Sequence, residues 1–152
     1  MTTLKQLLTI VFMMLMIATI TVLGQKKAVP DYKITNIKIV KFDEVTGQFG
    51  NEDIQDESFG NDLSMSLFVT IELTGPRGEF VARRNVSVRV TEGRKIKLSK
   101  IAYPGVLGES GHYYVPVWLY GSMCEPVKIT ASITGQKTLS THSRTVMFHC
   151  GE

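Results

Sequence analysis

The residues closest to a catalytic set lie together at 108–112, where the sequence reads Gly-Glu-Ser-Gly-His. A serine between glycines is typical of serine hydrolases, in which Gly-x-Ser-x-Gly exposes the hydroxyl at a turn between a strand and a helix. Here His112 takes the place of the last glycine, and no helical pattern follows. A small hydrolase built on Ser110 and His112 is therefore the least favoured function. We expect the protein not to be an enzyme and to need no cofactor.

A second candidate site is the segment 43–62, which holds seven of the fourteen acidic residues and no lysine or arginine. Ca²⁺ binds where several carboxylate and carbonyl oxygens converge on one point. The weak Ca²⁺ candidates are Glu52, Asp53, Asp56, Glu57 and Asp62. Because the spacing of an EF-hand is absent, a long solvated acidic loop is the favoured interpretation, and metal binding is the alternative.

A third candidate is the aromatic segment 111–121. Alternation along a strand places Tyr114, Pro116, Trp118 and Tyr120 on one face, and a more apolar set on the other. An exposed row of such rings is typical of contacts with proteins or sugars. The alternative is that a loop, such as the acidic one, covers the row. Proline in mid-strand lacks an amide donor and predicts an edge strand or a bulge.

The segment 77–100 is basic, with eight lysine and arginine residues against two glutamates. Alternation predicts that Arg83 and Arg89 share an outer strand face, which makes them candidates for partner binding. A solvated strand face whose charges protect the sheet edge is the favoured alternative. The whole chain carries a formal charge of only +3. We therefore expect no nucleic-acid partner, because such binding needs a concentrated basic face.

Strands must position all of these residues, because alternation with a period of two dominates after residue 31. Turn residues rich in glycine and proline separate the alternating segments. The predicted strands are 32–42, 63–74, 85–90, 94–101, 111–121, 125–134 and 138–150. This pattern predicts an all-β, about seven-stranded antiparallel sandwich of two sheets, with an immunoglobulin-like or fibronectin-like architecture. The Cys-Trp-Cys order of antibody domains is absent, since Trp118 precedes both cysteines.

The two cysteines, Cys124 and Cys150, flank the last predicted hairpin. If this hairpin folds back near residue 137, the two residues lie opposite each other at its open end. Opposed residues have Cβ atoms about 4.5–5.5 Å apart, which suits a disulfide after small adjustment. A shift of one residue in the register would spoil this arrangement. We predict one structural disulfide, since the spacing of a redox-active pair is absent.

Residues 1–24 have the pattern of a signal peptide, with Lys5 before an apolar run at 7–23 and polar sequence from Gln25 onward. The run is close to the roughly 20 residues that span a membrane, so an uncleaved anchor is the alternative. We expect a single domain at 25–152 that is secreted or periplasmic, or that is displayed outside the cell on an anchor. A glycosylation pattern begins at Asn85 but falls inside a predicted strand.

These observations predict an exported binding or assembly module. Its expected contacts are the aromatic strand face, the acidic loop and the basic strands, with another protein or a surface glycan as the partner. Self-association is also open, because the acidic loop of one copy could meet the basic strands of another. The alternative is a membrane-anchored structural subunit of a cell-surface or envelope assembly, which would contact the membrane only through a retained N-terminal segment. Ca²⁺-dependent function is less favoured.

Overall fold

The structure is a computed structural model that describes residues 31–51, 53–54, 58–59, 65–121 and 123–148. These residues form nine strands and no helix, which confirms the predicted all-β class. Accordingly, the described residues contain no helix that is long and apolar enough to span a membrane. The predicted signal segment, residues 1–24, lies outside the described residues.

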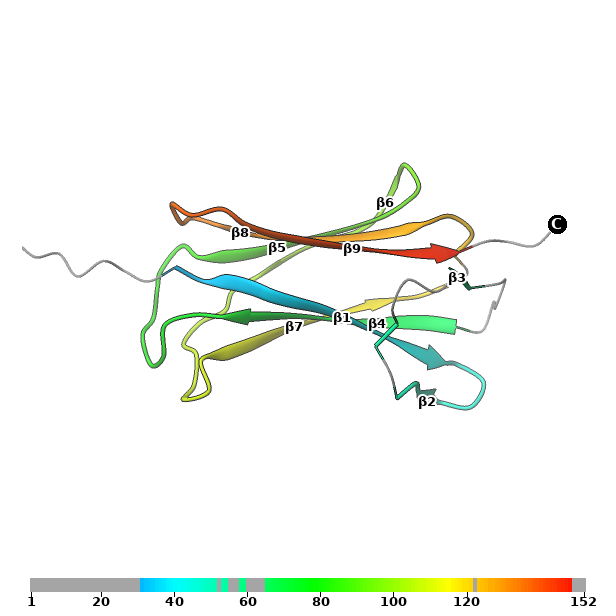
Figure 1. Ribbon diagram of the computed structural model, residues 1–152, viewed down its shortest axis with the longest axis horizontal. Helices are drawn as coiled ribbons and strands as arrows, with labels where there is room; N and C mark the ends of the chain where they lie inside the picture. The colour runs from blue at the N-terminus through cyan, green and yellow to red at the C-terminus, as the bar shows by residue number, and fades with distance from the viewer. Residues whose placement is uncertain (1–30, 52, 55–57, 60–64, 122, 149–152) are drawn as a thin grey trace, which may run out of the picture.

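The strands form two sheets that lie one above the other (Figure 1). The first sheet has the order β2 (Gln48–Phe49), β1 (Lys33–Asp43), β4 (Met65–Thr74) and β7 (His112–Leu119). The second has the order β3 (Ser58–Phe59), β9 (Ser140–Phe148), β8 (Val127–Thr134), β5 (Asn85–Glu92) and β6 (Lys95–Ala102). All strand pairs are antiparallel except the short β3–β9 pair.

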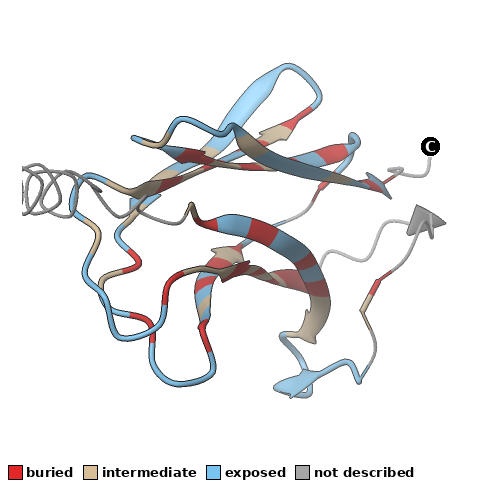
Figure 2. Ribbon diagram, turned by 60° about the vertical axis from the view of Figure 1, so that its left-hand side comes forward, coloured by how far each residue is buried: buried red, intermediate tan, exposed pale blue. Residues whose placement is uncertain are grey.

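The core lies between the two sheets and consists of every second side chain of the long strands. In β4 the buried positions include Leu67, Val69 and Ile71, and in β5 they include Val86 and Val88. Figure 2 shows the resulting alternation of buried and exposed residues along the strands. The inner face of each sheet is mainly apolar, so the two inner faces must cover each other to be removed from water. The fold is therefore β-sandwich-like.

In β6, alternation predicts that Ile96 and Leu98 point toward the core and that Lys95 and Lys97 point toward solvent. Leu98 packs against the core and both lysines are exposed, but the prediction was wrong for Ile96, which is 56% exposed. The pairing of β5 with β6 shifts between Val90 and Thr91, so that Leu98 pairs with Val90. This irregularity adds one residue to β6 and reverses the faces on either side of it.

The last hairpin, β8–β9, forms as predicted, but its register is shifted by one residue. Val127 lies opposite Val146 and Ile133 lies opposite Ser140, one position away from the register that the prediction assumed. Cys150 lies outside the described residues. The disulfide between Cys124 and Cys150 therefore stays a prediction.

The segment 43–62 contains more local structure in its described part than the sequence predicted. Asp43 begins a turn, in which its carboxylate Oδ1 accepts hydrogen bonds from the amides of Val45 and Thr46 at 2.8 and 3.1 Å. These backbone hydrogen bonds, that of Thr46 first, lower the pKa of Asp43 below its ordinary value. The turn leads into β2, which pairs with the end of β1 and brings Phe49 opposite Phe42.

The edge of β1 that β4 does not pair is closed by side chains from the second sheet and from the segment after β2. The guanidinium of Arg144, on β9, donates to the carbonyl of Ile37 at 2.6 Å, to the carboxylate of Asp53 at 2.8 Å and to the carbonyl of Ile54. Asp53 accepts the amide of Ile39 at 2.7 Å, and the amide of Ile54 donates to the carbonyl of Ile39. Arg144 and Asp53 thus satisfy backbone groups that an open strand edge would expose.

Further toward the start of β1, the same edge is bridged to the β8–β9 hairpin. The amide of Tyr32 donates to Gln136 Oε1 at 3.0 Å, and Gln136 Nε2 donates to the carbonyl of Tyr32 at 2.9 Å. The amide of Ile34 donates to Ser140 Oγ at 3.0 Å. This side of the molecule is therefore held together by polar side chains along much of the length of β1.

Candidate binding surface

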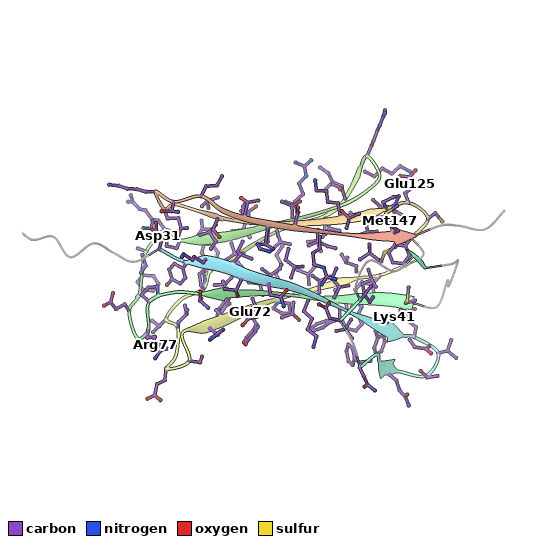
Figure 3. The ribbon with its side chains drawn as sticks, in the orientation of Figure 1. Asp31, Lys41, Glu72, Arg77, Glu125 and Met147 are labelled. Carbon is purple, nitrogen blue, oxygen red and sulfur yellow. The ribbon has the colours of Figure 1, made fainter. Side chains whose placement is uncertain are left out.

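Five aromatic residues pack against one another on the first sheet, and we call them the aromatic face. They come from β1, β2, β4 and β7 and the residue after β7, namely Phe42, Phe49, Phe68, Trp118 and Tyr120. Phe68 and Trp118 alternate with the buried neighbours Leu67, Val69, Val117 and Leu119. The aromatic face is therefore on the side of the sheet away from the core, the same side as Glu72, which Figure 3 labels.

Trp118 is the centre of this cluster. Its ring centroid lies 4.9 Å from that of Phe42, 5.4 Å from that of Phe68, 5.7 Å from that of Phe49 and 5.6 Å from that of Tyr120. The rings are tilted or T-shaped relative to one another, the arrangement that aromatic quadrupoles favour. Tyr120 is 73% exposed and Phe49 is 52% exposed, so the cluster offers rings to solvent at both its β7 and its β2 side.

The two interpretations of the aromatic row each describe part of the structure. The predicted alternation is confirmed, because Val115, Val117 and Leu119 are buried. Phe49, from the acidic segment, packs on Trp118 and leaves it only partly exposed. Tyr114, in contrast, is 54% exposed. The role of these residues in partner binding stays a prediction.

The strand that carries Trp118 is an edge strand, as Pro116 predicted. The ammonium group of Lys100, on β6 of the other sheet, donates to the carbonyl of Pro116 at 2.7 Å. This carbonyl therefore points away from β4, toward the open edge of β7. Proline has no amide hydrogen, and lysine covers the carbonyl, so the middle of this edge is protected against pairing with another strand.

A pocket of about 350 Å³ lies between β6 and β7, the edge strands of the two sheets. Its apolar lining comes from both sheets and from the β7–β8 connection: Val90, Leu98, Leu119, Met123 and Val127. Trp118 and Tyr120 also line it, so the aromatic face and the pocket share two residues. The indole Nε1 of Trp118 is buried and has no hydrogen-bond partner among the described residues.

The charged lining residue of the pocket is Lys97, and it forms an ion pair with Glu92. Lys97 Nζ lies 2.6 Å from Glu92 Oε2, while Glu92 Oε1 accepts the amide of Cys124 at 2.8 Å. Burial raises the pKa of the Glu92 carboxyl group. The hydrogen bonds from Lys97 and Cys124, together with the charge of Lys97, outweigh burial and hold this pKa below its ordinary value of 4.5.

The basic candidates do not join the aromatic face. Arg89 projects from β5 with buried neighbours on both sides, so it lies on the outer face of the second sheet. Arg83 precedes β5 in a turn with a φ of 64°, and it therefore does not share a strand face with Arg89 as alternation predicted. The two predicted partner-binding regions lie on opposite sides of the sandwich.

The remaining chemical candidates are the Ser110–His112 segment and the acidic residues of 43–62. His112 Nδ1 lies 2.8 Å from Glu72 Oε1 on the outer side of the first sheet, and Ser110 Oγ accepts the amide of His112. The pocket found at the sheet edge does not include these residues. Of the Ca²⁺ candidates, Asp53 binds Arg144, and Glu52, Asp56, Glu57 and Asp62 lie outside the described residues. The part of the chain that the structure describes holds no group of three or more potential metal ligands.

Sequence reasoning missed the three phenylalanines of the aromatic face. One signal was present: Phe68 is the only large apolar residue among the polar positions of its strand, 64 to 74. Phe49 could not be placed from the pattern, because only the turn after Asp43 folds β2 back along β1.

No model of a known protein family matches this chain, and neither does the sequence of any curated protein. The functional conclusion therefore depends on the fold and on the geometry of the aromatic face.

Proposed function

We propose that the protein is an exported, non-enzymatic binding or assembly module whose contact surface is the aromatic face. The observation that carries this proposal is a cluster of five rings in mutual contact on the solvent side of a sheet. Rigid rings bury much area at low cost in side-chain entropy, so such clusters are typical of interfaces. The runner-up is the same module retained on a membrane anchor as a structural subunit.

As part of this proposal, we assign the domain to the immunoglobulin-like or fibronectin-like architecture. Of the seven long strands, the first, second and fifth in chain order share one sheet, β1-β4-β7. The seventh, sixth, third and fourth share the other, β9-β8-β5-β6. This order supports the assignment, although the fourth strand of constant-type immunoglobulin domains pairs in the first sheet instead. The architecture by itself specifies no function.

The ring geometry favours a protein partner over a surface glycan. A sugar stacks on the flat, open face of a ring, but Phe42, Phe49 and Phe68 crowd around Trp118 at tilted or edge-on angles. The resulting surface is ridged, and it suits side chains that insert between the rings. Another copy of this chain is one such protein partner.

The test is capture of a partner from the secreted or envelope fraction of the cells that produce the protein, with Tyr120→Ala as the variant. Tyr103→Ala is the matched control, because Tyr103 is 70% exposed, against 73% for Tyr120, and does not belong to the aromatic face. We expect Tyr120→Ala to lose a protein partner that the wild type and Tyr103→Ala both retain. Equal capture by all three would overturn the proposed surface. If Tyr120→Ala loses binding to a glycan array but still captures the protein partner, the aromatic face is a sugar-binding site instead.

Export and anchoring are tested by the intact mass of the mature chain. We expect an N-terminus at Gln25, as a removed signal peptide requires. A mass that includes residues 1–24 would support the anchored subunit instead.

A further inference from the structure

The pocket beside the aromatic face has the size and lining of a small-molecule site. Its volume of about 350 Å³ falls at the lower end of the range of roughly 300–1,000 Å³ that ligand pockets occupy. An engineered apolar cavity of about 150 Å³ binds benzene. The present pocket could therefore hold a molecule with about twice the size of benzene, such as a chain of about eight carbons or two fused rings.

The charges around the pocket favour a neutral occupant. Lys97 is the one charged residue among the described residues of the lining, and Glu92 balances it at 2.6 Å. The carboxylate is itself fixed by the amide of Cys124. A charged ligand would enter a mostly apolar site in which no opposite charge is free to compensate it. Such a ligand would lose its hydration energy, and no ion pair in the pocket would compensate for that loss.

The polar atoms of the lining side chains are mainly donors. Lys97 has two further ammonium hydrogens besides the one directed at Glu92. Tyr120 adds a hydroxyl group. No lining side chain in the described part of the chain carries a carboxylate or a carboxamide oxygen. A ligand with an oxygen acceptor therefore fits this lining better than a ligand that can only donate.

We propose that this pocket binds a small, neutral and mainly apolar molecule that carries a hydrogen-bond acceptor, such as an aliphatic or aromatic alcohol or ketone. This goes beyond the proposed function, because the ligand enters between the sheets rather than covering the aromatic face. The two sites share Trp118 and Tyr120, so an occupant of the pocket would also stiffen one side of the aromatic face.

Trp118 provides the measurement, because it is the only tryptophan of the chain and lines the pocket. The probes are 1-octanol and octanoate, which have the same carbon skeleton and differ in charge. We expect a saturable change in Trp118 fluorescence with octanol, and at least tenfold weaker binding of octanoate. A stronger response to octanoate, or no saturable response to either probe, would overturn the proposal.

The charge argument is tested by Glu92→Gln, which keeps the shape of the side chain and one acceptor oxygen but removes its charge. Lys97 is then left without a compensating charge, so the preference should move toward octanoate by about tenfold or more. An unchanged ratio of the two affinities would show that the balance between Glu92 and Lys97 does not select the ligand.

The location is tested by filling the pocket with Leu98→Phe. The matched control is Ile101→Phe, which adds a ring to the same strand at an exposed position outside the pocket. Octanol binding should fall at least tenfold in Leu98→Phe and persist in Ile101→Phe. Equal octanol binding by both variants would place the probe elsewhere. Because Leu98 is not part of the aromatic face, partner capture by Leu98→Phe separates a failure of this proposal from a failure of the proposed function.

Discussion

Each lateral edge of the sandwich has backbone groups that could pair with another strand, and the two edges cover these groups in different ways. On one side, Arg144, Asp53 and Gln136 bridge β1 to the second sheet and occupy its free backbone groups. On the other side, Lys100 makes one contact with β7 across a gap that holds the pocket. Both edges are protected against strand addition, but only the first is filled. A sandwich can therefore stabilise one edge and keep the opposite edge available for binding.

The largest expected effect is the loss of the bridge on the filled edge. Arg144→Met should destabilise the domain by about 3 kcal/mol, because it leaves Asp53 and two carbonyl groups without their charged donor. Denaturant unfolding measures this change. Arg89→Met, at an exposed position of β5, is the control and should cost less than about 0.5 kcal/mol. If both variants lose a similar free energy of unfolding, the hydrogen bonds of Arg144 make no specific contribution to stability.

A smaller loss is expected at the start of the same edge. Gln136→Ala removes both hydrogen bonds to the backbone of Tyr32 and should cost about 1 kcal/mol. Lys137→Ala, at the neighbouring exposed position, should leave the unfolding midpoint almost unchanged. A cost that is the same in both variants would show that turn propensity, not the bridge, determines stability here.

On the open edge, we expect a dependence on pH that comes from Glu92. Its pKa in the folded state is below the ordinary value of 4.5, so the folded state binds its proton less readily than the unfolded state does. The ionised carboxylate therefore stabilises the fold above pH 4.5, and this contribution is lost as the pH falls through the lower pKa of the folded state. Comparing the unfolding of the wild type and Glu92→Gln between pH 7 and pH 3 measures it. A stability difference that stays constant over this range would contradict the assignment.

The smallest effect on stability is expected for Lys100→Met, which removes one exposed hydrogen bond and should cost less than about 0.5 kcal/mol. The same change exposes the carbonyl of Pro116 and removes a charge that protects the edge of β7. Sedimentation velocity should therefore show more self-association than in the wild type. If Lys100→Met self-associates no more than the wild type does, Pro116 alone is sufficient to protect the edge of β7.

Much of the fold could be predicted because the long strands alternate regularly. The pattern in β4, β5 and β8 specifies which side chains are buried, and burial of those side chains is what holds the sheets together. The exposure of Ile96 in β6 could not be predicted, since one extra residue opposite Val90 and Thr91 reverses the faces on either side of it. Such an irregularity depends on the neighbouring strand and leaves no clear signal in the strand itself.

The candidate site was predicted less completely than the fold. Trp118, Tyr114 and Tyr120 were found because they lie on one strand or directly after it, within reach of a local pattern. The phenylalanines that contact Trp118, namely Phe42, Phe49 and Phe68, come from three other strands. The separation of Arg89 from this surface also depends on which sheet each strand joins.

The sequence alone determined the class of the protein, because a period of two with polar turns admits strands and excludes helices in this domain. The tertiary structure decided which strands became edges, which rings met and where space remained between the sheets. The physical reason is that alternation is a local pattern, which relates each residue only to the residue two positions along the same strand. The aromatic face and the pocket instead result from contacts between strands that are distant in the chain, and the pairing of the sheets decides those contacts.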